Sequence, residues 1–422
     1  SPTEAPTRVL SIVALPAAPT AQPSGRPTAA NRTTKQPVSL PTTSPIQNVR
    51  PSLRPSRSPV RAPVPNEEVL NGFYIQQTNV LHESTYFSRL DTPISMSHDG
   101  STLIAGSLSG RHRALNVVSG SWKELTIALS VRGDLYVYHR QSMTSETWTP
   151  KGPSLKIDNA DFAPVLSFDG NTLAVGNYIA LNFAGTVTVY SWDDTSSSWE
   201  TLGQRLDGDQ AGDKFGWSVS LSGDGSTLAV GATQEATGQR VGYVRLYKFS
   251  SGLWRILEAD VPMEGNSSDG QMGWAVKLSG DGKRVAISQP FACRGRVLVY
   301  AVLNDRLGLL VERIEPDPSG KCLDLYGAGI ALNYDGRILA AGAPAWNAQG
   351  SDSGWVRVEL LDEGTNGEIG WQTIGTEIWG DGAGYFLGSG VALSGDGKML
   401  AVAAADENNA AGSRLFVYSL VI

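Results

Sequence analysis

The feature that most constrains the fold is a phrase that recurs six times along the chain, each time built around an Asp-Gly pair. The clearest copy is FGWSVSLSGDGSTLAVGA, residues 215–232, in which an alternating segment precedes the pair and an unbroken apolar segment follows it. An Asp-Gly pair between two such segments is a strong hairpin signal, because glycine accepts a positive φ at little cost. The phrase therefore predicts six β-hairpins, with turns at Asp99, Asp169, Asp224, Asp281, Asp335 and Asp396.

Each predicted hairpin belongs to a longer repeat. A third strand follows and ends in an aromatic residue in five of the six copies, and a fourth strand carries a tryptophan in four of them: Trp148, Trp199, Trp254 and Trp371. We label the strands of a repeat A, B, C and D, with the Asp-Gly turn between A and B. Successive aspartates are 70, 55, 57, 54 and 61 residues apart, and four strands per period of this size are typical of a propeller blade. The sequence predicts an all-β fold, a six-bladed β-propeller of four-stranded antiparallel blades.

The two ends of the repeat region complement each other. The last repeat stops after its C strand, and the segment 73–80, FYIQQTNV, precedes the first A strand. We predict that 73–80 supplies the missing D strand of the last blade, which closes the ring and removes an exposed sheet edge. The first spacing is long because of residues 108–132, which we interpret as an insertion between strands B and C of the first blade. A seventh blade hidden in this insertion is the alternative.

Composition divides the chain at about residue 66. Fourteen of the 23 prolines precede Asn66, and a segment so rich in Pro, Ser and Thr cannot bury enough apolar surface to offset the entropy of ordering. We expect a disordered stalk or linker over 1–66 and the propeller over 67–422. Residues 1–65 hold eight basic and one acidic residue, a net charge of +7, and the other 26 basic and 40 acidic residues leave −14. An acidic body disfavours nucleic acid, and no apolar run is long enough to predict a membrane span.

Several weaker signals indicate an extracellular or cell-surface location. Cys293 and Cys322 fall in loops that the repeat pattern places side by side, so we predict a disulfide between them. Asn31 and Asn266 each begin an Asn-x-Ser/Thr tripeptide, the acceptor pattern for N-glycosylation. The sequence leaves open whether a signal peptide preceded Ser1 or the chain is a fragment.

The D–A and B–C loops of a propeller share one face, and binding residues concentrate on loops that a rigid scaffold holds. This face carries acidic and aromatic residues, and we predict that it binds a protein or a glycan ligand. The alternative is a solvated acidic rim with tryptophans packed between blades. The candidate ligand-binding residues are Asp207, Asp209, Asp213, Trp217, Trp274, Trp346, Asp381 and Tyr385.

The repeated phrase resembles the FG-GAP repeat of integrin α-subunit propellers. Phe215-Gly216 with Gly231-Ala232 matches this pattern, and so does Tyr326-Gly327 with the literal GAP at 342–344. The phrase is also similar to WD-like propeller repeats with a Ser-x-Asp-Gly turn, and such repeats behind a Pro/Ser/Thr-rich leader resemble predicted secreted surface proteins of algae. The resemblance implies a propeller and specifies function weakly. FG-GAP repeats that bind calcium use several Asp or Asn side chains per turn. Each turn here has one Asp, so we interpret the six aspartates as turn residues and predict no metal.

Catalysis finds little support in the sequence. No Gly-x-Ser-x-Gly elbow is present, and none of the four histidines lies beside a plausible nucleophile: His82, His98, His112 and His139. We predict a protein that is not an enzyme and needs no cofactor, a secreted or surface-displayed binding or adhesion module. The alternative is a propeller hydrolase or lyase that acts on polysaccharide.

Overall fold

The structure is a computed structural model of the chain. It describes residues 69–70, 73–82, 94–96, 103–105, 115–119, 125–131, 134–140, 149–157, 163–234, 241–259, 271–292, 295–303, 306–314, 324–347, 349–363, 369–404 and 414–421. The predicted stalk, residues 1–66, lies outside the described residues.

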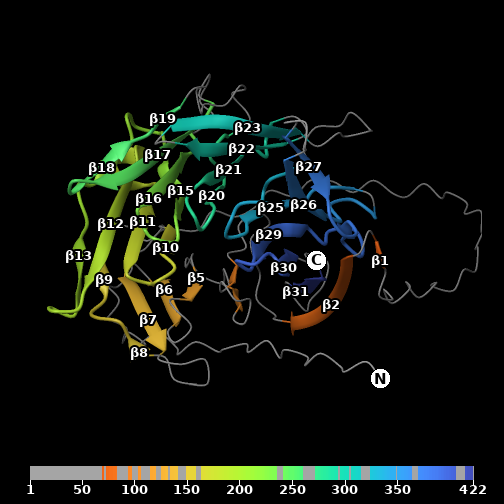
Figure 1. Cartoon of the computed structure of the whole chain (residues 1–422), viewed down its shortest axis with the longest axis horizontal. Helices are drawn as coiled ribbons and strands as arrows, with labels where there is room; N and C mark the ends of the chain where they lie inside the picture. Colours follow the sequence, from red (N-terminus) through yellow and green to blue (C-terminus); the bar gives the residue numbers. More distant parts are fainter. Residues whose placement is uncertain are drawn as a thin grey trace, which may run out of the picture. The chain divides into compact units, whose positions relative to one another are not determined.

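The described residues form seven sheets and a single short helix, α1 (Ala180–Phe183) (Figure 1). In chain order the first sheet is the hairpin of β3 (Ile94–Met96) and β4 (Leu103–Ala105), and the second holds β5 (Leu115–Ser119), β6 (Leu125–Val131), β7 (Asp134–Arg140), β8 (Thr149–Pro150) and β9 (Leu155–Lys156). The third holds β10 (Ala163–Leu166), β11 (Thr172–Asn177), β12 (Thr186–Asp193), β13 (Ser198–Thr201) and β14 (Leu206–Asp207). The fourth holds β15 (Phe215–Leu221), β16 (Thr227–Ala232), β17 (Tyr243–Ser250) and β18 (Leu253–Ile256).

The remaining three sheets come from the C-terminal half and from the start of the described chain. One holds β19 (Glu258–Ala259), β20 (Val276–Leu278), β21 (Arg284–Ser288), β22 (Arg296–Leu303) and β23 (Arg306–Ile314). The next holds β24 (Ile330–Leu332), β25 (Ile338–Ala343), β26 (Trp355–Glu363), β27 (Ile369–Thr373) and β28 (Ile378–Trp379). The last joins β29 (Leu387–Leu393), β30 (Met399–Ala404) and β31 (Arg414–Val421) to β2 (Phe73–His82) and β1 (Val69–Leu70). All strand pairs are antiparallel except β19 with β23.

The Asp-Gly turns have the predicted geometry wherever the structure describes them. In the turn between β15 and β16, Gly225 has a φ of 68°. The Ser222 hydroxyl donates to Asp224 Oδ1 at 2.6 Å, and the same oxygen accepts the Ser226 amide at 3.0 Å. The equivalent glycines 170, 282, 336 and 397 also have positive φ values, between 67° and 72°. The sixth, Gly100, lies outside the described residues.

The number of sheets differs from the prediction, because the insertion at 108–132 contains strands of its own. Within it, β5 and β6 pair with each other, and β6 pairs with β7, the strand that the sequence assigned to the first repeat. The prediction of six blades is therefore not confirmed, since the described residues form seven sheets. The sequence offered a seventh blade in this insertion only as the alternative, because the segment between β5 and β6, residues 120–124, lacks the Asp-Gly pair that marks the other hairpins.

The A strand of each sheet, a position that β5 takes in the additional sheet, contacts the A strand of the next. These strands are β3, β5, β10, β15, β20, β24 and β29, and β29 in turn contacts β3. The predicted partner of the last C strand is confirmed, because β2 pairs antiparallel with β31 from Tyr74↔Val421 to His82↔Arg414. The sheets thus follow one another in a closed cycle, the arrangement of a β-propeller.

The hydrophobic core lies between neighbouring sheets. Val187 and Val189 of β12 pack with Phe215 of β15 and with Leu228 and Val230 of β16. β16 is buried along its whole length, as expected of a continuous apolar strand covered on both faces. Because each sheet is covered by the sheets before and after it, the loops at the strand ends are the segments left to bind a ligand.

Candidate functional site

The D–A and B–C loops lie at one end of the sheets. Phe215, which begins β15, pairs with Ala232, which ends β16, and Ala232 pairs with Tyr243, which begins β17. We call this end of the sheets the loop face. The Asp-Gly turns lie at the other end, where the ring of Phe168 contacts the ring of Tyr334 at 5.4 Å. We call that end the turn face.

Glycines set the contact between neighbouring sheets at the loop face. A Cβ atom on Gly231 of β16 would lie 2.2 Å from the carbonyl oxygen of Gly273 in the next sheet, and one on Gly176 of β11 would lie 2.3 Å from that of Gly216. These distances leave no room for a side chain. The two halves of the FG-GAP phrase therefore meet across the junction, with the late glycine of one repeat against the early glycine of the next.

Four aromatic rings form a continuous row across three sheets of the loop face. Tyr178 contacts Trp217 with ring centroids 4.8 Å apart, Trp217 contacts Trp274 at 5.1 Å, and Trp274 contacts Phe291 at 5.0 Å. All four side chains are half-buried, so part of each remains exposed. We call these four residues the aromatic row. It is a contiguous, partly exposed aromatic surface.

Both tryptophans of the row hold equivalent positions in successive sheets. Each directly follows an early glycine, Gly216 or Gly273, and the contact of that glycine with the preceding sheet fixes its place. Each also closes a tight turn, because the Trp217 amide donates to the Lys214 carbonyl at 3.0 Å and the Trp274 amide donates to the Gln271 carbonyl at 3.2 Å. Lys214 further places its Nζ 5.8 Å from the centre of the Trp217 ring.

The sequence predicted Trp217 and Trp274 but missed the other two members of the row. Tyr178 comes directly after β11, and Phe291 comes three residues after the end of β21. Both therefore belong to B–C loops, and an aromatic residue close behind a B strand was the signal that could have found them.

The B–C loop after Tyr178 has an unusual backbone. Leu181, Asn182 and Phe183 all have positive φ values, 51°, 61° and 64°, a conformation that costs side-chain-bearing residues free energy. The side chains of Leu181 and Phe183 are 50% and 45% exposed. Strained backbone that presents apolar side chains to solvent beside the aromatic row is a second sign of a binding surface.

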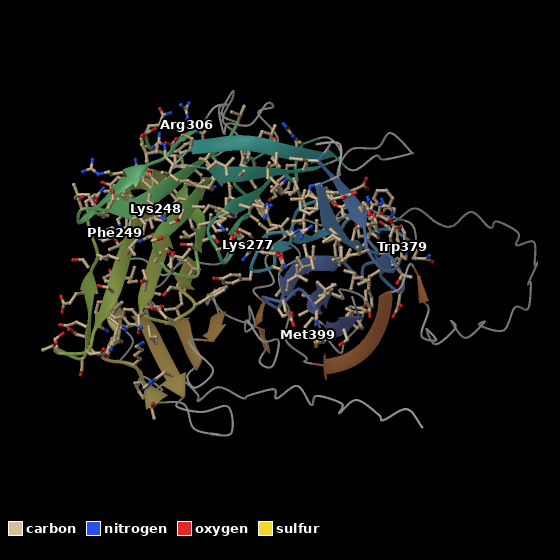
Figure 2. The ribbon with its side chains drawn as sticks, viewed as in Figure 1. Lys248, Phe249, Lys277, Arg306, Trp379 and Met399 are labelled. Carbon is tan, nitrogen blue, oxygen red and sulfur yellow. The ribbon has the colours of Figure 1, made fainter. Side chains whose placement is uncertain are left out.

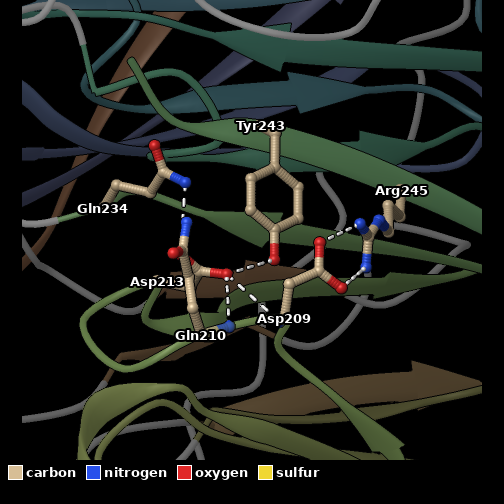
Figure 3. Close-up of polar contacts among 6 residues, drawn as sticks. All are labelled: Asp209, Gln210, Asp213, Gln234, Tyr243 and Arg245. Carbon is tan, nitrogen blue, oxygen red and sulfur yellow. Dashed lines mark hydrogen bonds and ion pairs between the residues drawn. The ribbon is translucent and has the colours of Figure 1, made fainter. Parts of the chain in front are cut away.

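Asp213 anchors the D–A loop that leads into the row (Figure 3). Its side chain is fully buried. Its Oδ2 accepts the amides of Asp209 at 3.1 Å and Gln210 at 3.2 Å and the Tyr243 hydroxyl at 3.1 Å, while Oδ1 accepts the Gln234 side-chain amide at 3.2 Å. Burial, with a contribution from this carboxylate, raises the pKa of Tyr243. Asp213 therefore positions the loop from within instead of facing a ligand.

The other two acidic residues of this loop are held in ion pairs. Asp209 binds Arg245 through both carboxylate oxygens, with Nη1 and Oδ1 2.9 Å apart (Figure 3). The hydrogen bonds from Arg245 lower the pKa of Asp209. Asp207 binds Arg205 in the same two-pronged manner, at 2.7 and 2.9 Å. Both carboxylates are partly exposed, but each has its charge compensated by an arginine.

Trp346, Asp381 and Tyr385 lie in other sheets. Trp346 packs on Trp355 and Trp379 with centroids 5.4 and 6.3 Å apart, and Figure 2 shows Trp379 far from Phe249 of the β15–β18 sheet. The buried Tyr385 packs against Phe416, with its ring tilted relative to that ring, and donates to Asp381 at 3.4 Å. These contacts place Trp346 against β26 and Tyr385 against β31, outside the series of ring contacts that makes up the aromatic row.

A lysine that the sequence did not single out lies on an inner strand. Lys277 of β20 holds the position that Ser220 holds in the preceding sheet, and Figure 2 shows it toward the middle of the ring of sheets. Burial lowers the pKa of its ammonium group, because the charged form is disfavoured away from water.

The structure does not test the predicted disulfide and glycosylation sites. Cys293, Cys322, Asn31 and Asn266 lie outside the described residues, so the disulfide and the glycosylation sites stay predictions. In the part of the chain that the structure describes, no three His, Cys, Asp or Glu side chains gather as a metal site would require. No helix in that part is long and apolar enough to span a membrane.

Comparison with known proteins supports the repeat. Residues 207–246 match the FG-GAP repeat family, a segment that includes Asp213, the Phe215-Gly216 pair and Trp217. No curated protein matches the chain. Among solved structures, the chain is similar to the crystal structure of a candidate 6-phosphogluconolactonase from Bacteroides uniformis. The two are 13% identical with a TM-score of 0.45, and the match covers 73% of this chain and 82% of that one.

Proposed function

Because the chain is a β-propeller with an FG-GAP repeat at 207–246, we propose that it is a secreted or cell-surface binding module. Its ligand, a protein or a glycan, lies across the loop face. The observation that carries the proposal is the aromatic row, because contiguous exposed apolar surface marks interaction sites more often than singly scattered apolar side chains do. Tryptophan and tyrosine are also enriched among the residues that contribute most to binding energy.

The scaffold suits this role. The aromatic row spans three sheets whose spacing is set by the contacts of Gly176 and Gly231 with the following sheets, and the buried carboxylate of Asp213 holds the adjoining loop. Binding to a surface that is already ordered costs less conformational entropy than binding to one that must be ordered first. The match to FG-GAP repeats supports an extracellular location.

A combined glycan and protein array tests the proposal. The full chain is compared with Trp217→Ala and Trp274→Ala, and with Tyr334→Ala as the matched control, because Tyr334 is a 41% exposed aromatic on the turn face. We expect each tryptophan variant to lose about tenfold or more in affinity and the control to bind like the unaltered chain. Circular dichroism confirms that all variants are folded.

Two results would count against the proposal. If both tryptophan variants retain full affinity for every ligand found on the array, the aromatic row is not the binding surface. If a bound polysaccharide is shortened during incubation, as chromatography of the recovered sugar would reveal, the chain is an enzyme instead of a binding module. Peptide mapping without reductant tests the location, since free thiols at Cys293 and Cys322 in protein from the native host would argue against export.

A further inference from the structure

We infer that the ligand of the aromatic row is an uncharged polysaccharide. This inference rests on the proposed function and narrows it from any protein or glycan to one class of polymer. It follows from three properties of the row: its chemistry, its repetition from sheet to sheet and the charges around it.

The first property is the chemistry of the rings. The face of an aromatic ring carries a partial negative charge, and the C–H groups on one side of a sugar ring carry a partial positive charge. A sugar therefore stacks on an aromatic side chain through its C–H groups while its hydroxyls stay free for hydrogen bonds. Tyr178, Trp217, Trp274 and Phe291 are each half-buried. Part of the surface of each residue therefore stays exposed for a sugar to contact.

The second property is repetition. The turns that precede Trp217 and Trp274 have the same backbone conformation, because their first residues, Lys214 and Gln271, have φ values of 55° and 49°. These two successive sheets thus present a half-buried polar side chain, a tight turn and a half-buried tryptophan in the same order. A ligand built from repeating units meets equivalent groups as it passes from one sheet to the next. A polymer of sugars has this repetition, and a single small molecule does not.

The third property is charge. Residues 66–422 have a net charge of −14, which repels a polyanion such as a sulfated or uronate-rich polysaccharide. In the D–A loop before β15, which the structure describes, a polycation meets carboxylates that are already compensated or enclosed: Asp209 and Asp207 are paired with Arg245 and Arg205, and Asp213 is buried. The ammonium group of Lys214 over Trp217 also repels cations. An uncharged polymer avoids both penalties.

The test is titration calorimetry of the full chain with three sets of soluble polysaccharides. The uncharged set is mixed-linkage β-glucan, xylan and mannan, the anionic set is alginate and carrageenan, and the cationic polymer is chitosan. We expect binding to a member of the uncharged set only. We expect its affinity to change little between low and high salt, since stacking involves no net charge.

Variants assign the binding to the aromatic row. Trp217→Ala and Trp274→Ala should each weaken binding about tenfold or more, and Tyr334→Ala on the turn face should leave it unchanged. Binding confined to the charged polymers, binding abolished by high salt, or equal losses in all three variants would overturn the inference.

Binding to the proteins on the array distinguishes a failure of the inference about polysaccharides from a failure of the proposed function. If no polysaccharide binds but a protein binds and is lost in Trp217→Ala, the proposed function stands and the inference about sugars is wrong. If neither class of ligand shows binding that depends on the two tryptophans, both are wrong.

Discussion

At the scale of single residues, two uses of glycine explain the repeated phrase. The glycine after each described Asp-Gly aspartate has a positive φ, as the hairpin pattern predicted. The glycine late in strand B has another role, because the next sheet approaches its Cα too closely for a side chain. The first role is local and could be predicted from the sequence around Asp224. The second depends on the neighbouring sheet and could not be.

A prediction at this scale concerns Gly231. Its φ is not in the left-handed region, so Gly231→Ala tests crowding alone, with the new Cβ 2.2 Å from the carbonyl oxygen of Gly273 and 2.4 Å from the Ser218 hydroxyl. We expect a loss of about 1–3 kcal/mol in the free energy of unfolding, measured by urea denaturation. The matched control is Gly370→Ala, also in a strand and with open space around the new Cβ. Equal stability of the two variants would show that the junction between sheets is not tightly packed.

The sequence predicted some residues of the candidate site and missed others, depending on whether the repeat pattern determines their positions. Trp217 and Trp274 follow strand-initial glycines in the repeat, so their common face could be predicted from the pattern. The positions of Tyr178 and Phe291 depend on the paths of B–C loops, which no periodicity specifies. Asp213 looked like an exposed rim carboxylate, but its hydrogen bonds to Tyr243 and to two backbone amides require burial.

At the scale of elements, the D–A loop before β15 combines a buried anchor with an exposed ion pair. The Asp209 carboxylate is 58% exposed and the Arg245 side chain 27% exposed, so the pair is worth only about 0.2–1 kcal/mol. Arg245 lowers the pKa of Asp209 in the folded state. A lowered pKa means that the folded state favours the ionised form, so the pair stabilises the fold above the unfolded pKa of about 4. The stabilisation is lost as the pH falls through the folded value.

The lowered pKa of Asp209 leads to a prediction for the stability of Asp209→Asn as a function of pH. At pH 7 the variant should be less stable than the unaltered chain by the small amount given above, and the difference should shrink at an acidic pH below the unfolded pKa of about 4, as the carboxylate becomes protonated. Urea denaturation at the two pH values measures it. The same substitution in an Arg245→Gln background is the control and should have no effect at either pH. A difference that persists undiminished at low pH would show that the ion pair is not its cause.

The sheet of β5 to β9 shows, at the scale of elements, why one repeat was not identified from the sequence. The sequence pattern identified six hairpins because each has an Asp-Gly turn, and it assigned β7 to the first of them. The strands β5 and β6 carry apolar residues, LNVVS and LTIALSV, but the residues between them, 120–124, contain no Asp-Gly pair. A repeat that lacks its marker is invisible to a search for the marker, although the spacing of 70 residues between the first two aspartates indicated that something additional lay there.

At the scale of the whole propeller, the ends of the repeat region are joined by backbone pairing. The strand β2 completes the sheet of β29, β30 and β31 over nearly its full length. That sheet contacts both the β24 sheet and the β3 hairpin, so it closes the cycle. The missing D strand of the last repeat made this closure predictable from the sequence, because an unpaired β31 would expose a sheet edge.

The loop face depends on that closure, since the aromatic row is assembled from side chains of three sheets whose spacing the cycle maintains. The most direct test is thermal unfolding, followed by circular dichroism, of two truncated chains. Removal of residues 1–66 leaves β2 in place and should change the melting temperature little. Removal of residues 1–82 deletes β2, and we expect the cooperative transition to disappear and a synthetic peptide of residues 73–82 to restore it. If the two truncated chains melt cooperatively at the same temperature, β2 does not close the propeller.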